Sequence, residues 1–199
     1  MPRPCSVAVS VWYSLRRRLG AALIALATAG LAASPASSQA QFRLTSKDLS
    51  PDKPVQSAQV YDKEGCRGQN RSPQLQWSGA PAATKSFAVT VYDLDAPGRG
   101  WWHWVVASIP KNVTSLPENA SASGYLKSIH AMEARNDYDA PGYGGPCPPS
   151  GKPHRYVVTV YALGTNDLRL APGRPALMFD HEINTTALAK ASITVTYGR

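Results

Sequence analysis

Alternating apolar and polar side chains dominate this chain from residue 42 onward. Strand-like runs, most with apolar residues two positions apart, occupy residues 42–49, 75–77, 86–93, 101–110, 157–163 and 193–197, and turn-forming Gly, Pro, Asn and Ser separate them. A period of two is typical of β-strands, because successive side chains point to opposite faces. The short spacing of the turns predicts a mainly β protein, a sandwich-like arrangement of antiparallel strands.

Two segments depart from this pattern. From Pro175 to about Ala191 the sequence predicts a C-terminal helix, because proline suits a first helical position and Leu177, Ile183 and Leu188 could form a buried stripe. Residues 111–141 are irregular and polar. We expect most of that stretch to be an ordered surface loop, with a site-forming loop or a mobile cover as the alternative.

The first 40 residues have the features of an export signal. Arg16, Arg17 and Arg18 precede a short Ala/Leu-rich run at 19–33, and the small residues of 38–40 would allow cleavage after Ala40. The prediction is therefore a cleaved signal at 1–40 and one mature domain at 41–199, periplasmic or secreted and without a stable membrane anchor. A buried N-terminal helix is the alternative, and twin-arginine export is a less favoured route.

The net charge of the chain does not indicate a nucleic-acid partner. The chain has 21 Lys and Arg against 13 Asp and Glu, a formal charge of +8, but four of the basic residues and none of the acids lie in 1–40. The remaining 17 basic and 13 acidic residues give +4, and the basic ones are scattered. This pattern argues against nucleic-acid binding.

The stretch 86–110 carries the strongest chemical signal. Asp93 and Asp95 continue the odd-numbered phase of the apolar residues at 87–91, and a turn at 96–100 can bring His103 back beside them. We therefore expect a small polar pocket at the end of a sheet. The alternative is that the two aspartates only fix the turn through hydrogen bonds to its backbone.

The tryptophans beside His103 supply a possible wall. On a regular strand Trp101 shares a face with His103, whereas Trp102 and Trp104 share the other. We therefore expect Trp101 to line the pocket, although core packing is the more common role for any one tryptophan.

Five parts of the sequence resemble one known family, and they follow one another along the chain as they do in that family. They are Asp93–Pro97, Trp102–Val106, Gly144–Pro149 followed by His154–Tyr156, the loop Gly65–Trp77 and the ending Tyr197–Arg199. Together they resemble the phosphatidylethanolamine-binding protein family, in particular its bacterial Raf-kinase-inhibitor-like branch. The resemblance covers nearly all of 42–199.

The resemblance implies two antiparallel sheets with a C-terminal helix, no cofactor, and a pocket for phosphate, phosphoryl head groups or acetate-like ions. The matching ligand-binding positions are Asp93, Asp95, His103, Gly145, Pro146, Cys147, His154 and Tyr156. We expect a non-enzymatic, exported anion-binding protein, with docking on or inhibition of a partner protein as an extension.

Carboxylates next to an anion need a physical explanation. Our hypothesis is that Asp93 and Asp95 keep His103 and His154 protonated, because an opposite charge favours the charged imidazole. Backbone N–H groups at Gly145 and Cys147 would add further donors.

Other chemistries remain open at this point. Two Asp and two His could bind a metal, although their spacing has no metal-diagnostic regularity. A phosphoester hydrolase with Asp93 or Asp95 as base and a histidine as acid is the second hypothesis, and an interaction protein with a vestigial pocket is the third. Nucleophilic catalysis is disfavoured, because the chain has no Gly-x-Ser-x-Gly motif and nothing near Cys147 would activate its thiol.

Cys66 and Cys147 are the cysteines that remain after signal removal. In an oxidising compartment, two cysteines in turn-rich loops favour a disulfide that would join those loops. Two separate buried thiols are the alternative, because the sequence does not give the distance between the two positions.

Overall fold

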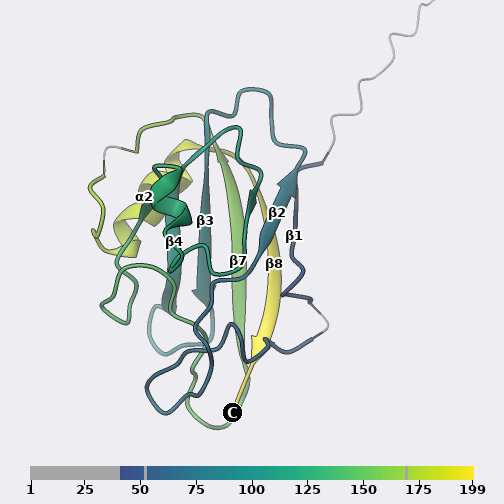
Figure 1. Ribbon diagram of the computed structural model, residues 1–199, viewed down its shortest axis with the longest axis vertical. Coiled ribbons are helices and arrows are strands. Elements are labelled where there is room, and N and C mark those ends of the chain that lie inside the picture. The colour runs from purple at the N-terminus through teal and green to yellow at the C-terminus, as the bar shows by residue number, and fades with distance from the viewer. Residues whose placement is uncertain (1–40, 52, 169) are drawn as a thin grey trace, which may run out of the picture. The chain divides into compact units, whose positions relative to one another are not determined.

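Two antiparallel sheets make up the described part of the chain (Figure 1). The computed structural model describes residues 41–51, 53–168 and 170–199, so the predicted export signal at 1–40 lies outside it. The small sheet has the order β1 (Arg43–Thr45), β2 (Leu75–Ser78), β5 (Ser115–Leu116). The large sheet has the order β6 (Met132–Glu133), β4 (Trp101–Pro110), β3 (Ser86–Asp93), β7 (His154–Leu163), β8 (Ala187–Tyr197).

The described residues contain few helices, and none of these is long and apolar enough to cross a membrane. They are α1 (Tyr125–Ser128) and the C-terminal α2 (Ala176–Thr186). Every strand pair is antiparallel. The predicted fold class, two antiparallel sheets with a C-terminal helix, is confirmed.

Each face of the large sheet has its own apolar core. Val89, Val91 and Val158 belong to the inner core, which also contains Trp77 and Leu75 of the small sheet. On the other face, α2 packs against residues such as Ala88 and Val105 in a separate outer core. Because both of its faces are covered, β3 is buried at nearly every position, although its inward-facing residues end in an acid, Asp93.

The predicted helix Pro175–Ala191 is too long. The helix ends at Thr186, where the hydroxyls of Thr185 and Thr186 donate to the Glu182 carbonyl at 3.0 and 2.8 Å. The next residue, Ala187, is extended, and 187–191 pair with β7 as the first part of β8. A strand neighbour was available to these residues, and that tertiary pairing replaced local helix formation.

The buried stripe of α2 also differs from the expected one. Ala176, Phe179 and Ile183 are the buried residues of the helix, so Ile183 alone of the three predicted positions lies in the core. Leu177 is 54% exposed, and Leu188 is 46% exposed on β8.

Two other predicted boundaries shift for local reasons. The first strand, expected to extend to Leu49, ends at Thr45 because the Ser46 hydroxyl donates to the Gln74 carbonyl and accepts the N–H groups of Asp48 and Leu49, which turns the chain. The irregular stretch 111–141 contains the short elements β5, α1 and β6.

A bulge at His103 changes which tryptophans share a face. Val91 pairs with Trp104 and the next residue, Tyr92, pairs with Trp102, so His103 has no partner in this register. Trp102 consequently lies in the outer core and Trp104 in the inner one. The expectation that these two tryptophans share a face is wrong, because it assumed an unbroken alternation.

Truncating the buried face of α2 should destabilise the protein far more than truncating its exposed face. We expect Phe179→Ala to lower the free energy of unfolding by about 3–5 kcal/mol, because Phe179 is fully buried and its loss leaves a cavity. Leu177→Ala on the same helix should change it by less than about 0.5 kcal/mol. Urea denaturation of both variants measures the difference, and equal losses would contradict this packing.

Candidate functional site

A cavity of about 510 Å³ opens where β3 and β7 meet the start of β4. We call it the Asp93 pocket. Five of the predicted ligand-binding residues line it: Asp93, His103, Cys147, His154 and Tyr156. Trp101, the expected wall, also lines it, together with Glu64, Asp137, Tyr138, Asp139 and a proline-rich rim at Pro97, Pro148 and Pro149.

Asp93 has two roles in this arrangement. It is 3% exposed at the end of β3. Its Oδ1 accepts the N–H groups of Asp95 and Ala96, at 2.8 and 3.1 Å, and its Oδ2 lies 2.8 Å from Nδ1 of His154. The carboxylate therefore fixes the turn and orients the histidine, which combines the two alternatives left open by the sequence.

Asp95 lies outside the pocket. The chain turns directly after Asp93, so Asp95 does not continue the inner face of β3. Its carboxylate instead accepts the backbone N–H of Arg155 at 2.8 Å and two guanidinium N–H groups at 2.9 and 2.7 Å. Hydrogen bonds from Arg155 hold the pKa of Asp95 well below its ordinary value. Asp95 is thus an anchor for β7, outside the cavity lining.

His103 is buried and neutral at physiological pH. Its Nδ1 lies 2.7 Å from the Gly144 carbonyl, which can only accept, so Nδ1 carries the proton. Burial lowers the pKa of His103 despite the opposing effects of the Gly144 carbonyl and Asp93. The hypothesis that the aspartates keep both imidazoles protonated is therefore wrong for His103, because desolvation outweighs the nearby charge.

Aromatic side chains build one wall of the pocket, beside His103. The Tyr138 ring stacks on Tyr61 with centroids 4.1 Å apart, and it meets the rings of Trp101 and His103 edge to face, each at 5.5 Å. Its hydroxyl donates to the Gly145 carbonyl at 3.1 Å. These contacts fix Tyr138 as a rigid side of the pocket.

Tyr156 carries an unsatisfied buried polar atom. The residue is 1% exposed, and its hydroxyl has no hydrogen-bond partner among the described residues. Burial is the main reason that its pKa is raised. The Asp93 carboxylate adds to the shift, because it lies close enough to the hydroxyl to interact with it, although the two form no hydrogen bond of regular geometry. The indole N–H of Trp101 is also buried without a partner in the described part of the chain. Both residues line the Asp93 pocket.

Gly145 and Pro146 lie outside the cavity lining and hold the neighbouring loops together by hydrogen bonds. The Gly145 N–H, expected to face an anion, instead donates to Oδ1 of Asn70 at 2.7 Å. A Cβ on Gly145 would lie 2.2 Å from the Gln59 carbonyl oxygen, so glycine is required for this close approach. The Pro146 carbonyl accepts the N–H of Tyr61 at 3.2 Å. Neither residue is part of the cavity lining.

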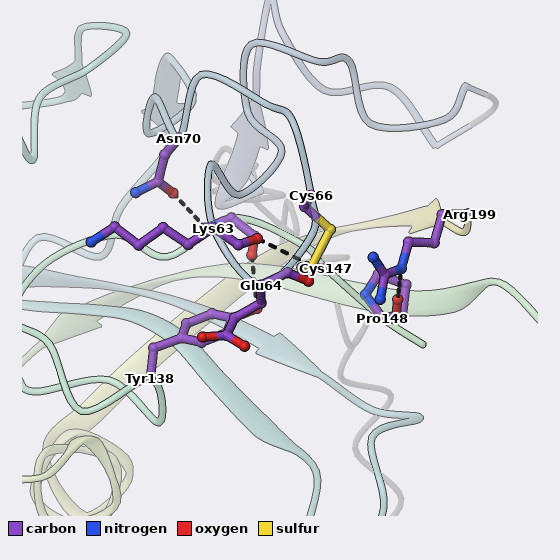
Figure 2. Close-up of a disulfide and its surroundings, with 9 residues drawn as sticks. Lys63, Glu64, Cys66, Asn70, Tyr138, Cys147, Pro148 and Arg199 are labelled. Carbon is purple, nitrogen blue, oxygen red and sulfur yellow. Dashed lines mark hydrogen bonds between the residues drawn. A yellow bond between two sulfur atoms is a disulfide. The ribbon is translucent and has the colours of Figure 1, made fainter. Parts of the chain in front are cut away.

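The predicted disulfide is present. Cys66 and Cys147 are bonded, with Cα atoms 6.0 Å apart and 81 positions apart in the sequence (Figure 2). The bond joins the loop that contains Glu64 to the proline-rich rim of the pocket. Two separate thiols, the alternative left open by the sequence, are excluded in this structure.

Three pocket acids were not predicted as site residues. Asp137 accepts the Trp102 N–H at 2.9 Å and forms an ion pair with Arg99 at 3.2 Å, and Asp139 forms an ion pair with Arg135. The polar run 135–139 is visible in the sequence, but nothing local places it beside β4. Glu64 is the third acid. Among the described residues, no group of three or more His, Cys, Asp and Glu is arranged to hold a metal ion.

The buried state of His103 has a measurable consequence. We expect its imidazole to stay neutral, with the proton on Nδ1, through the range around pH 6.5 where an ordinary histidine gains its proton. Because the folded pKa is the lower one, this group should cost stability as the pH falls below the unfolded value of about 6.5. Nitrogen chemical shifts of His103 followed from pH 8 to 5 measure this, and a midpoint at or above pH 6.5 would contradict the burial argument.

Comparisons with known proteins agree with this geometry. A family model described as phosphatidylethanolamine-binding protein matches residues 45–198. The UPF0098 protein YbcL of Escherichia coli is 43% identical over 161 residues, which cover 79% of this chain and 88% of YbcL. YbhB of the same organism is 38% identical over 157 residues, 78% of this chain and 99% of YbhB.

Solved structures show the same relationship. The crystal structure of Escherichia coli YbcL, described as a new member of the mammalian PEBP family, matches with a TM-score of 0.77 and 42% identity, covering 80% of this chain and 99% of that one. A phosphatidylethanolamine-binding protein homologue from Chlamydia trachomatis, CT736, matches with a TM-score of 0.67 and 29% identity, covering 79% and 97%. The chain belongs to the phosphatidylethanolamine-binding protein family.

Proposed function

We propose that this protein binds a small anion or phosphoryl group in the Asp93 pocket, without turning it over. The observation that carries the proposal is the Tyr156 hydroxyl, a buried donor that lines the pocket and has no partner among the described residues. A buried polar group left unsatisfied costs about 1–3 kcal/mol. A ligand oxygen placed beside Tyr156 would remove that cost.

The neighbouring groups suit an oxyanion. His154 is held at Nδ1 by Asp93, which leaves its Nε2 to face a ligand. When that nitrogen is protonated, it supplies a charge-assisted hydrogen bond. The Trp101 N–H is a second unpartnered donor on a residue that lines the same cavity.

The Asp93 carboxylate need not repel such a ligand. Both of its oxygens are already engaged, one by the turn N–H groups and the other by His154. The carboxylate is thus already satisfied by donors of the protein itself.

The family name adds a chemical clue. It names phosphatidylethanolamine, whose head group contains a phosphodiester, and the donors described above suit phosphoryl oxygens. A phosphorylated side chain of a partner protein presents the same group, so docking on a partner falls within this proposal.

A hydrolase is the second candidate, supported by the direct Asp93–His154 contact at 2.8 Å. Asp95 is a poor base for that chemistry, because Arg155 engages both of its oxygens. Turnover of a phosphoester by the wild type, abolished in His103→Ala, would favour the hydrolase over the binding protein.

Removing one hydroxyl from the pocket should weaken anion binding. We expect Tyr156→Phe to bind inorganic phosphate roughly two- to tenfold more weakly, the value of one neutral hydrogen bond. His154→Ala should bind it at least about tenfold more weakly, because the whole imidazole is lost from the pocket wall. Calorimetric titration of residues 41–199 with phosphate and with phosphoethanolamine measures both effects.

Tyr161→Phe is the matched control. Tyr161 lies on β7 like Tyr156, but it belongs to the outer core on the opposite face of the sheet. Its hydroxyl should not affect phosphate affinity. Saturable phosphate binding that is equal in wild type, Tyr156→Phe and His154→Ala would place the anion elsewhere and overturn the proposal.

We also propose that the protein is exported. The proposal rests on the signal-like residues 1–40 and is consistent with the disulfide, which an oxidising compartment would preserve. Expression of the full chain in a Gram-negative host should yield a periplasmic product that begins at Gln41, as read by intact mass. A cytoplasmic product that retains Met1 would contradict this.

A further inference from the structure

The loop tip at residues 62–67 brings an acid to the mouth of the Asp93 pocket. We call it the Glu64 tip. All of its residues are exposed except Cys66, and Glu64 is the one charged residue of the tip that lines the pocket. Glu64 has a φ of 54°, a left-handed conformation that is unusual for glutamate. Its backbone is therefore fixed in a costly conformation at the rim of the cavity.

The disulfide is the main tie between this tip and the rest of the pocket. At the base of the loop, the N–H groups of Gly68 and Asn70 donate to the carbonyls of Tyr61 and Val60, each at 2.8 Å. Within the described residues, the tip backbone makes one N–H hydrogen bond, from Cys66 to the Lys63 carbonyl, which is internal to the tip. The carbonyl oxygens of Lys63 and Glu64 also lie 3.8 and 3.7 Å from Sγ of Cys147, which has no hydrogen to donate while it is part of the disulfide. The bond from Cys66 to Cys147 is what joins it to the opposite rim (Figure 2).

The opposite rim is anchored independently of the disulfide. The Pro146 carbonyl accepts the Tyr61 N–H at 3.2 Å, and the Pro148 carbonyl accepts Nε of Arg199 at 2.7 Å. Figure 2 shows this second bond beside Cys147. Breaking the disulfide should therefore release the Glu64 tip and leave Cys147 and the prolines in place.

Glu64 differs from the other acids of the pocket because no basic side chain forms an ion pair with it in the described part of the chain. Asp93 is engaged by three donors, Asp137 by Arg99, and Asp139 by Arg135. Glu64 has no ion-pair partner among the described residues, and its charge contributes to the raised pKa of Tyr138, which burial mainly causes. An uncompensated negative charge thus acts on the pocket interior.

We propose that Glu64 is a specificity-determining residue, fixed at the pocket mouth by the Cys66–Cys147 disulfide, and that its carboxylate discriminates against doubly charged anions until the disulfide is reduced. The inference rests on the anion site proposed above and adds to it a selectivity and a redox control. At short range in a partly aqueous cavity, one carboxylate repels a dianion about twice as strongly as a monoanion.

The chemistry of release is ordinary thiol–disulfide exchange with a dithiol reductant. Cys147 is the more accessible sulfur, because Cys66 is only 7% exposed. A thiolate of the dithiol bonds to Cys147 Sγ and displaces Cys66 as a thiolate, which takes up a proton. The second thiol of the reductant then closes the reductant's own disulfide and displaces Cys147. Two protein thiols and one oxidised dithiol result.

Four forms of the protein, compared with the oxidised wild type, test the proposal by calorimetric titration with inorganic phosphate at about pH 8, where phosphate is a dianion. Reduction with dithiothreitol should tighten phosphate binding by about three- to tenfold, and Glu64→Gln should tighten it equally in the oxidised protein. Reduced Glu64→Gln should bind no more tightly than the oxidised variant, because the charge that the disulfide positions is already gone. The double variant Cys66→Ser, Cys147→Ser should match the reduced wild type without any reductant.

Asp62→Asn is the matched control, since it removes the same charge from the same tip at a position outside the cavity lining. It should leave phosphate affinity within about twofold of wild type. Amide hydrogen exchange should also accelerate at 62–67 on reduction and stay unchanged at 154–160, which separates release of the tip from loss of the fold.

The outcomes separate this inference from the proposed function. Phosphate binding that depends on His154 but is insensitive to reduction and to Glu64→Gln would overturn the inference alone. Binding that depends on Glu64 but not on His154 or Tyr156 would overturn the proposed site, with the anion held at the mouth. Tighter binding in Asp62→Asn equal to that in Glu64→Gln, weaker binding on reduction, or no binding in any form would also overturn the inference.

Discussion

The buried carboxylate of Asp93 is the constraint on which the pocket end of the molecule depends. A charge that is 3% exposed at the end of an apolar strand has to be met by donors. The backbone of the following turn supplies two of them and His154 on the neighbouring strand supplies the third. Satisfying one group therefore fixes the turn after β3, the join between β3 and β7, and the orientation of the histidine.

The His103 bulge has a comparable effect on β4. By leaving one residue out of the register, it sends Trp102 to the outer core and Trp104 to the inner one. His103 then bonds to Gly144 through its side chain and its backbone carbonyl, at 2.7 and 2.9 Å, which draws the loop before the proline-rich rim onto the sheet. A single irregularity thus couples the sheet, the two cores and the rim.

Loops form the rest of the pocket, and they need ties that strands do not. Hydrogen bonds with Tyr61, Asn70 and Arg199 hold the rim around Pro146 in place, while a covalent bond holds the more exposed tip that carries Glu64. The pocket therefore combines a floor in which Asp93, His154 and Tyr156 are positioned by the sheet with one wall that a disulfide joins to the opposite rim.

The sequence by itself determined the fold class, most strand positions and most of the pocket floor. Alternation reports directly which face a strand residue occupies, and the segments around Asp93, His103 and His154 occur in an order that resembles one family. Tertiary structure decided what depends on non-local partners. Neighbours that lie far away in the chain decided the end of α2, the direction of Asp95 toward Arg155, the neutral state of His103 and the position of Asp137. The local spacing of residues does not encode these contacts. The pairing of Cys66 with Cys147 lies between these cases, because the sequence named the two candidates and only the fold brought them within bonding distance.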